Sequence, residues 1–325
     1  MKALLCTAFG PLEQLSVQEL AAPRPGPRQV LIDIKAAALN FPDALMVQGL
    51  YQVKPPLPFV PGAEFAGVVT ETGADVRNCK LGDPVIAYGL GGFAEQAVAD
   101  AAHVMPLPAG MDFAAGAAFV LTFSTSLHGL RDRGRLQAGE TLLVLGAAGG
   151  VGVAAIEIGK AMGARVIAAA SSDAKLALCT QLGADAVINY ATENLRERIS
   201  ELTDKQGVDV VYDPVGGPYT EPAVRSLAWG GRLLVIGFAA GEIPKIAINH
   251  LLLKERSLVG VYWGESVKHN PKQHLANLRQ LLDWFAAGKL KPLISERVPL
   301  AEAPAAMARL ASRQVMGKVI VLPEA

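Results

Sequence analysis

The chain has 325 residues, of which 51% are hydrophobic and 18% are charged. One ordinary hydrophobic core does not extend over this length, so we expect two domains, and the composition excludes a largely disordered protein. The 30 basic and 30 acidic residues cancel, so the charge gives no support to a nucleic-acid surface or an anionic membrane as partner.

Three cysteines, Cys6, Cys79 and Cys179, lie far apart in the sequence. This spacing excludes a disulfide framework and a CxxC-type zinc site, and it indicates a reducing compartment. The N-terminus has no signal-peptide core, and no uncharged apolar run reaches the ~18 residues that a membrane span needs. We therefore expect a cytoplasmic protein without a membrane partner.

The first 120 or so residues contain short apolar runs that proline and glycine interrupt, for example at 30–34, 67–69 and 84–87. Short strands joined by tight turns have this texture. The sequence therefore predicts a β-rich N-terminal domain.

From about residue 125 the pattern changes to α/β. Residues 141–145 form a continuous apolar run, which is typical of a strand buried on both faces. After a glycine-rich turn, apolar residues at helical spacing continue to Gly163. Further strands are predicted at 165–170, 186–188, 208–212, 232–236 and 258–262, with a helix at 173–182. This alternation predicts a parallel, doubly wound sheet of the Rossmann type.

The last sixty residues are too few for a third domain. They predict a helix at 274–287, a strand at 294–298, a helix at 301–311 and a strand at 318–322. We expect a β-rich domain of residues 1–124 that residues 266–325 complete, and a dinucleotide-binding domain of residues 125–265.

The turn after the first Rossmann strand reads Gly-Ala-Ala-Gly-Gly-Val-Gly at 146–152. Gly146 allows a tight turn, and Gly149 and Gly150 let the backbone approach a pyrophosphate closely. The helix that follows offers free N–H groups and a positive dipole end to that anion. Because the turn lies between a buried strand and a helix, it predicts a dinucleotide site that includes Ala148 and Val151.

The end of the second Rossmann strand favours NADP over NAD. An acidic residue about 20 positions after the glycines would bind the ribose of NAD, but this strand ends in Ser171 and Ser172, with Lys175 one helical turn later. Two hydroxyls and an ammonium suit a 2′-phosphate. Asp173 has two interpretations: it is a residue of the helix's first turn, or it faces the ribose. The second interpretation leaves NAD open as an alternative. Ser172 is also a natural helix N-cap.

These stretches carry a resemblance. The chain resembles the zinc-independent members of the medium-chain dehydrogenase/reductase superfamily, above all the NADPH:quinone oxidoreductases, and the resemblance implies that its β-rich domain is GroES-like. The matching segments run nearly from end to end: ALNFPD at 38–43, GLY at 49–51, PGAEFAG at 61–67, STSLH at 124–128, the glycine turn, INY at 188–190, DPVGG at 213–217 and GK at 317–318.

The same resemblance bears on zinc. Zinc alcohol dehydrogenases carry a cysteine where Asn40 stands and a His-Glu pair where Ala63 and Glu64 stand. Zinc prefers thiolate and imidazole ligands, so we expect no metal. The five histidines show no pair at metal-binding spacing: they are His103, His128, His250, His269 and His274. Without a Lewis acid, reduction of an electron-poor acceptor is easier than oxidation of an alcohol.

The resemblance also implies the remaining site residues. Asn40 and Thr125 are expected beside the nicotinamide, and Tyr51 and Phe41 along the acceptor, for which their flat apolar faces are suitable. Phe41 is equally interpretable as a core residue. Asp43 and Glu64 are more readily interpreted as structural hydrogen-bond acceptors than as proton carriers. On the cofactor side the resemblance implies Tyr190, Val215, Gly237, Phe238, Tyr262, Trp263, Arg313 and Lys318, the last two near a phosphate.

The sequence thus predicts NADPH-dependent, metal-free reduction of a quinone, with Tyr51 as the best side-chain candidate for a general acid and solvent as an equal alternative. The second hypothesis is reduction of the C=C bond of an enal, enone or acryloyl-type thioester. A third is a non-enzymatic role as a crystallin or RNA-binding protein, since relatives have been recruited to both. The apolar run at 258–262 resembles the sheet edge through which family members dimerise, so we expect a homodimer.

Overall fold

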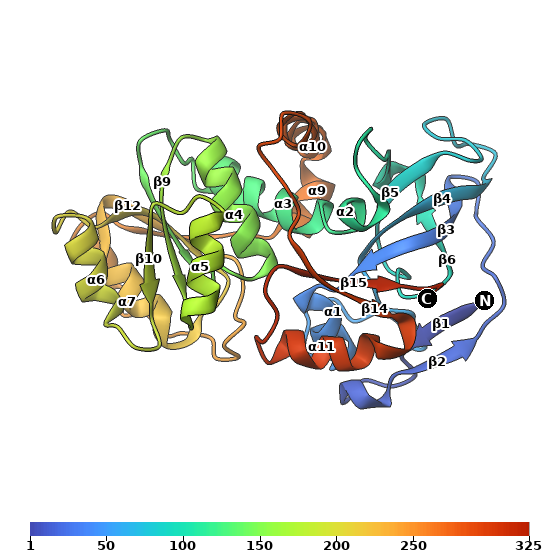
Figure 1. Cartoon of the computed structure of the whole chain (residues 1–325), viewed down its shortest axis with the longest axis horizontal. Coiled ribbons are helices and arrows are strands. Elements are labelled where there is room, and N and C mark those ends of the chain that lie inside the picture. The colour runs from blue at the N-terminus through green and yellow to red at the C-terminus, as the bar shows by residue number, and fades with distance from the viewer. Residues whose placement is uncertain (325) are drawn as a thin grey trace. The chain divides into compact units, whose positions relative to one another are not determined.

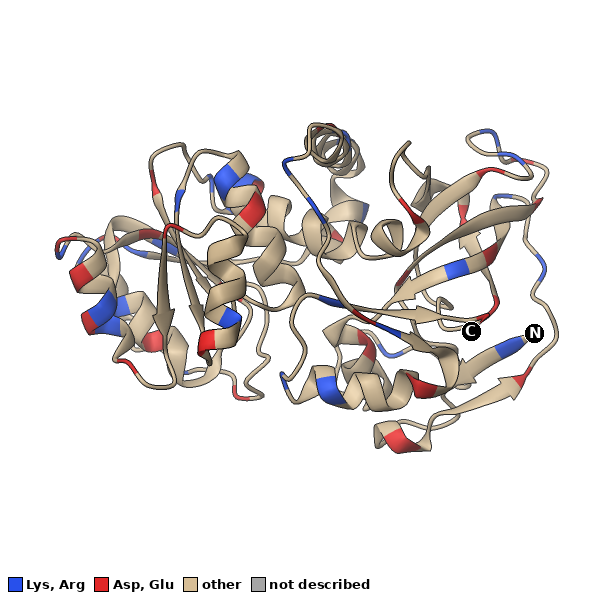
Figure 2. Cartoon of the chain, viewed as in Figure 1, with Lys and Arg blue, Asp and Glu red and all other residues tan. Residues whose placement is uncertain are grey.

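The computed structural model describes residues 1–324 and divides the chain into two compact units (Figure 1). The first unit contains residues 1–121 and the chain from Pro292 onward, and the second contains Thr122–Lys291. Charged residues of both signs are spread over the elements of each unit (Figure 2). No helix within residues 1–324 is both long enough and apolar enough to cross a membrane.

The first unit is built around a seven-stranded sheet. Its strands are, in spatial order, β14 (Ile294–Pro299), β15 (Lys318–Leu322), β3 (Gln29–Ala38), β4 (Glu64–Thr72), β5 (Pro84–Tyr88) and β7 (Val104–Pro106), with β6 (Gln96–Asp100) paired to β3. A separate antiparallel pair consists of β1 (Lys2–Leu5) and β2 (Ser16–Glu19). The helices of this unit are α1 (Phe41–Val47), α2 (Phe113–Ala117) and α11 (Ala303–Ala311).

The C-terminal strands β14 and β15 belong to the first unit's sheet. β15 pairs antiparallel with β3, Ile320 opposite Ala38, and parallel with β14. α11 packs beside α1 (Figure 1). The core joins apolar side chains from both ends of the chain, for example Ile32, Phe65, Met307 and Val321.

The second unit holds a six-stranded parallel sheet in the order β10 (Ala186–Asn189), β9 (Arg165–Ala170), β8 (Thr141–Leu145), β11 (Val208–Asp213), β12 (Leu227–Val235) and β13 (Ser257–Gly260). The order reverses at β8, which makes this strand the topological switch point, where ligands of such sheets bind. The sheet confirms the predicted doubly wound fold.

The second unit also contains helices and one π-helical segment. They are α3 (Val120–Leu127), which begins in the first unit, the π-helical segment His128–Arg133, α4 (Gly150–Ala161), α5 (Asp173–Gln181), α6 (Leu195–Leu202), α7 (Thr220–Arg225), α8 (Asn249–Leu252), α9 (Trp263–His269) and α10 (Pro271–Ala286). The side chains of β8 are buried from Leu142 to Leu145, in agreement with a strand covered on both faces.

The division between the units differs from the one expected from the sequence, because residues 266–291 belong to the second unit. Polar side chains tie α10 to the π-helical segment. Asn277 Nδ2 donates to Asp132 Oδ2 at 2.7 Å, and His128 Nδ1 lies 3.0 Å from the same oxygen. These side-chain contacts leave no trace in the hydrophobic pattern, so the sequence does not reveal them.

Candidate functional site

The glycine turn lies at the carboxyl end of β8, the switch-point strand. Gly146 has φ of 58°, and a Cβ there would lie 2.7 Å from Val215 Cγ2. A Cβ at Gly152 would lie 2.5 Å from the Gly146 carbonyl oxygen, so the first turn of α4 packs directly on the loop. α4 therefore begins at Gly150 with its N–H groups directed out of the turn, the arrangement that binds a pyrophosphate.

The hydroxyl and ammonium groups predicted to bind a phosphate lie together at the end of β9. Ser171 Oγ accepts from Lys175 Nζ at 3.3 Å, across one turn of α5. Ser172 caps α5, and its side chain accepts from the Lys175 backbone N–H. Ser172 therefore caps α5, while Ser171 Oγ and the Lys175 ammonium lie together at the same strand end.

Asp173 is held by a residue that the sequence did not single out. Asn189, at the end of the adjacent strand β10, donates its Nδ2 to Asp173 Oδ1 at 2.8 Å. Asn189 is largely buried, and its Oδ1 accepts from the Ala191 N–H at 3.2 Å. Asp173 is therefore a first-turn helix residue with a fixed partner, which agrees with the first of its two interpretations.

The loops after β10, β11 and β12 supply the other residues expected near a cofactor. The Tyr190 and Tyr219 rings lie 4.3 Å apart at 41°. Asp213 Oδ1 accepts from the N–H groups of Val215 and Gly216 at 2.9 and 2.8 Å, which shapes the loop that carries Val215. The Ala239 N–H donates to the Pro214 carbonyl oxygen at 3.1 Å, and this contact joins that loop to the one with Gly237 and Phe238.

Three further predicted residues belong to the second unit. Thr125 lies on α3, whose next residue, Ser126, contacts the Val151 carbonyl oxygen at 3.1 Å and the Tyr212 hydroxyl at 2.9 Å. α3 is thereby fixed to the start of α4. Tyr262 is partly exposed, and Trp263 meets the His274 ring edge-on at 5.6 Å.

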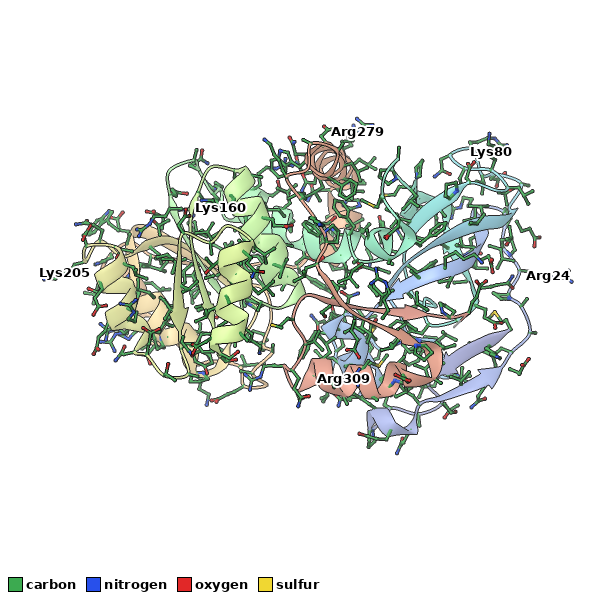
Figure 3. The ribbon with its side chains drawn as sticks, in the orientation of Figure 1. Arg24, Lys80, Lys160, Lys205, Arg279 and Arg309 are labelled. Atoms are coloured by element: carbon green, nitrogen blue, oxygen red, sulfur yellow. The ribbon has the colours of Figure 1, made fainter. Side chains whose placement is uncertain are left out.

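In the first unit, four predicted or weighed residues form one buried polar group. Asn40, Asp43, Glu64 and Lys318 have exposed fractions of 5%, 0%, 0% and 5%. Lys318 Nζ donates to Asn40 Oδ1 at 2.5 Å and lies 3.3 Å from Glu64 Oε1. The sequence led us to expect Lys318 near a phosphate, but its ammonium is instead engaged inside this unit by Asn40 and Glu64. The charged side chains of Arg24, Lys80 and Lys205, by contrast, project outward in Figure 3.

The two carboxylates of this group also serve the backbone. Asp43 Oδ2 accepts from the Asn40 N–H at 2.8 Å and so caps α1. Glu64 Oε2, at the start of β4, accepts from the Leu121 N–H at 2.6 Å. These contacts agree with the interpretation of both carboxylates as structural acceptors.

Burial sets the titration of these acids. Loss of hydration raises the pKa of Asp43 to about 7, against the opposing effects of the Asn40 N–H and the Lys318 charge. Burial likewise raises the pKa of Glu64, and the Lys318 charge lowers it. In the second unit, burial raises the pKa of Glu157 on α4 to about 7.

The remaining predicted residues of the first unit occupy different environments. Phe41 is half-buried as the first residue of α1, and Tyr51 packs partly buried against the main core of this unit. Arg313 is exposed in the turn after α11, with φ of 60°.

The donor set around Asn40 does not fit a metal ion. Asn40 and Ala63 offer neither thiolate nor imidazole, the ligands that zinc prefers. The Lys318 ammonium already lies within 2.5 Å of the Asn40 oxygen and would repel a second cation. Across residues 1–324, no three His, Cys, Asp or Glu side chains gather into a group that could hold a metal.

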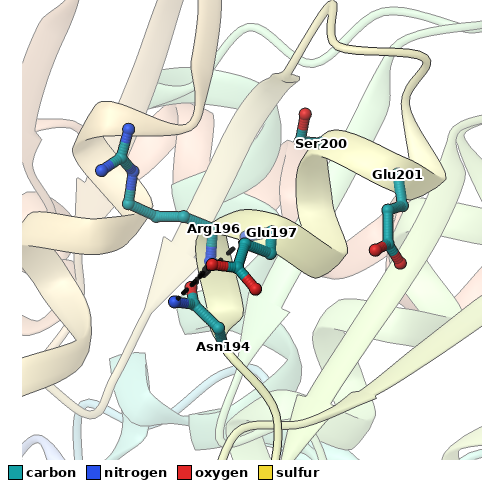
Figure 4. Close-up of a pocket in the computed structure, with 5 residues that line it drawn as sticks. All are labelled: Asn194, Arg196, Glu197, Ser200 and Glu201. Atoms are coloured by element: carbon teal, nitrogen blue, oxygen red, sulfur yellow. Dashed lines mark hydrogen bonds between the residues drawn. The ribbon is translucent and has the colours of Figure 1, made fainter.

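A hollow of about 500 Å³ lies elsewhere, over the exposed face of α6 (Figure 4). Asn194 caps this helix by accepting from the N–H groups of Arg196 and Glu197 at 3.1 and 3.3 Å. The side chains that line this hollow are charged or polar, and none of them is a predicted site residue. The hollow therefore has the character of a solvated helix surface.

Comparison with known proteins connects these features to relatives. Residues 26–109 match the family model described as alcohol dehydrogenase GroES-like domain, and residues 150–285 match the one described as zinc-binding dehydrogenase. The bovine (Bos taurus) protein named quinone oxidoreductase-like protein 2 is 38% identical over 98% of this chain and 92% of its own length.

Solved structures extend the likeness to the whole fold. The Escherichia coli quinone oxidoreductase complexed with NADPH is 29% identical, with a TM-score of 0.93 over 99% of this chain and 100% of that one. The CurK enoyl reductase is also 29% identical, with a TM-score of 0.89 over 99% of this chain and 98% of that one.

Proposed function

Because this chain belongs to the quinone oxidoreductase family of the medium-chain dehydrogenase/reductase superfamily, and is thus an oxidoreductase, we propose that it reduces a quinone with NADPH and without a metal. The observation that carries the proposal is that the glycine turn follows β8 while Ser171 and Lys175 lie at the end of the adjacent strand β9. The glycine turn would hold the pyrophosphate, and Ser171 with Lys175 would hold the 2′-phosphate.

NADPH is preferred in this proposal because of the charges at the end of β9. Lys175 Nζ lies 3.3 Å from Ser171 Oγ, so an ammonium and a hydroxyl converge on one place. The carboxylate of Asp173, which would repel a phosphate, is held by Asn189. The relative from Escherichia coli, complexed with NADPH, supports the same assignment.

When bound, NADPH supplies a hydride, and the protein's own residues hold the reactants. Thr125 is proposed to contact the nicotinamide, and Asn40 a carboxamide or an acceptor oxygen. The flat faces of Phe41 and Tyr51 suit a planar acceptor ring. Orientation and exclusion of water lower the barrier for a well-held pair by ~7–11 kcal/mol, and solvent or Tyr51 supplies the protons.

The absence of a metal requirement is supported by the donor set around Asn40. The Lys318 ammonium lies 2.5 Å from the side-chain oxygen of Asn40, and Ala63, which precedes Glu64 in the chain, has no ligand atom in its side chain. The chemistry left to such a site is reduction of an acceptor that is already electron-poor.

The decisive experiment measures NADPH oxidation against a panel of quinones, enals and enones, in parallel with NADH. We expect the largest kcat/KM for a quinone with NADPH. Comparable affinities for NADPH and NADH would contradict the phosphate assignment. Turnover of conjugated enones far above that of quinones would favour the second candidate, reduction of activated C=C bonds, which the likeness to the CurK enoyl reductase supports.

A homodimer through the open sheet edge is part of the proposal. β13 is the last strand of its sheet. Exposed apolar side chains lie just before it in the chain, at Ile248, Leu252 and Leu253, and on the paired strand β12, at Trp229; all four are 66–80% exposed. An apolar, unpaired edge favours pairing with a second copy. Light scattering should give twice the chain mass, and Leu252→Asp with Leu253→Asp should give a monomer. Leu275→Asp, on α10, is the control that should remain dimeric.

A cytoplasmic location is proposed from the cysteines alone. Cys6, Cys79 and Cys179 are all free thiols, which suits a reducing compartment.

A further inference from the structure

The first unit buries three ionisable side chains beside Asn40. We call Asp43, Glu64 and Lys318 the buried charge cluster: all three side chains are within 5% of complete burial. Removing such groups from water is costly, and well-packed apolar residues commonly replace them without loss of stability. One buried ammonium faces two carboxylates here, and Asp43 Oδ1 makes no hydrogen bond within residues 1–324. Stability alone therefore gives a weak reason for the cluster.

The cluster determines which end of the Asn40 amide is available. A lysine ammonium has three donors and no acceptor, so the Asn40 atom 2.5 Å from Lys318 Nζ is the amide oxygen. The amide nitrogen, on the same planar carboxamide, therefore points away from Lys318. Its contact there is the Ala38 carbonyl oxygen at 3.3 Å, which is long for a hydrogen bond. Asn40 therefore retains donor capacity and has its acceptor engaged.

The cluster also holds the ammonium in place. Glu64 Oε1 lies 3.3 Å from Lys318 Nζ, and Glu64 Oε2 is anchored by the Leu121 N–H. Lys318 begins β15, whose strand pairing with β3 fixes its backbone opposite the end of the strand that leads to Asn40. Because its backbone and its ammonium are both held in this way, Lys318 keeps Nζ next to the Asn40 amide oxygen.

We propose that Lys318 is a positioning residue that fixes the Asn40 amide with Nδ2 as a hydrogen-bond donor to the carbonyl oxygen of the acceptor. This inference rests on the proposed function. Bound NADPH would supply the hydride and be left as NADP⁺. The hydride would form a C–H bond at a conjugated carbon of the acceptor, or an O–H bond at one of its two carbonyl oxygens. The displaced electron pair would collect on the remaining carbonyl oxygen, which would then take a proton from solvent. A donor directed at that oxygen stabilises the developing charge, whereas a flipped amide would place its own oxygen there.

Two substitutions test the inference from opposite sides. Asn40→Asp keeps an oxygen for Lys318 and replaces the Nδ2 donor by an acceptor, so the fold should persist while kcat falls by ~100-fold, the scale of losing one preorganised donor. Lys318→Met removes the ammonium at similar length and should lower kcat by a similar factor, with the Kd for NADPH changed less than about 3-fold. Lys35→Met is the control, because Lys35 pairs only at the surface with Asp33 and Glu324, and it should keep full activity.

A double variant separates positioning from stability. Lys318→Met alone leaves two buried carboxylates without a cation, and it should therefore lower the Tm. Lys318→Met with Glu64→Gln removes one charge of each sign and should recover Tm but not kcat. Recovery of kcat together with Tm would overturn the inference, and so would full activity of Asn40→Asp.

A spectroscopic measurement keeps the inference testable if no acceptor in the panel is reduced. In protein labelled with ¹⁵N-asparagine, the Asn40 side-chain amide signal is assigned by its loss in Asn40→Asp. We expect Lys318→Met to shift this signal strongly and Lys35→Met to leave it in place. An unchanged Asn40 signal in Lys318→Met would refute the positioning contact, independently of whether the protein reduces quinones.

Discussion

Replacement of the buried carboxyl Asp43 by asparagine should change how the stability of the first unit depends on pH. Burial raises the pKa of Asp43 from its ordinary 3.8 to about 7 in the folded chain. Between these two values the folded state holds a proton that the unfolded state has released. The free energy of unfolding contributed by this group is therefore fully present below pH 3.8 and is lost as the pH rises through 7.

The size of the effect follows from the width of that window. Each pH unit between the two pKa values changes the free energy of unfolding by about 1.4 kcal/mol. The slope weakens as the pH reaches the folded pKa of about 7, so the wild type should lose about 2 kcal/mol relative to Asp43→Asn between pH 5 and pH 7. For a unit of about this size, 1 kcal/mol shifts Tm by roughly 2–4 °C. We therefore expect the Tm of Asp43→Asn to gain about 4–8 °C on the wild type over this range.

Scanning calorimetry from pH 5 to pH 8 measures this difference, because it records each melting transition of a chain that has two compact units. An asparagine can still accept from the Asn40 N–H through its oxygen, so the cap of α1 is retained. Asp75→Asn, at an exposed site, should run parallel to the wild type. Parallel curves for Asp43→Asn as well would show that Asp43 is already ionised at pH 5 and would refute the reasoning.

Three further outcomes follow from the second unit and from the donor set. Lys175→Ala should weaken NADPH binding by about 10-fold, because a partly exposed charge-assisted contact with phosphate is lost; an equal loss for NADH in a fluorescence titration would mean that the phosphate lies elsewhere. Ser126→Ala should lower the free energy of unfolding by about 1–3 kcal/mol in urea, because it removes a partner of the buried Tyr212 hydroxyl; a change within error would show that water replaces it. A chelator should leave activity unchanged, and metal analysis should find no stoichiometric zinc; activity lost with EDTA and regained with zinc would contradict a metal-free mechanism.

Local patterns in the sequence determined much of the fold. β8, β9 and β15 occupy the residues that their apolar runs indicated, because a strand buried on both faces must be apolar throughout. The glycine turn was equally predictable from the sequence, because glycine is suited to the positive φ at Gly146 and to the close packing at Gly152. The cap of α5 by Ser172 follows from its neighbours in the chain.

Only the tertiary structure decided which polar groups meet. Lys318 and Asn40 are 278 positions apart. The sequence alone predicts that a lysine at the start of a C-terminal strand is solvated or binds a phosphate, and only the pairing of β15 with β3 shows its actual partner. Asn189 and Asp173 likewise meet because β10 lies beside β9. Hydrophobic periodicity records which face of an element is buried, but it holds no information on the partner of a buried charge. The sequence by itself thus determined the dinucleotide fold and its turn, whereas strand pairing decided that the Lys318 charge lies next to the Asn40 amide.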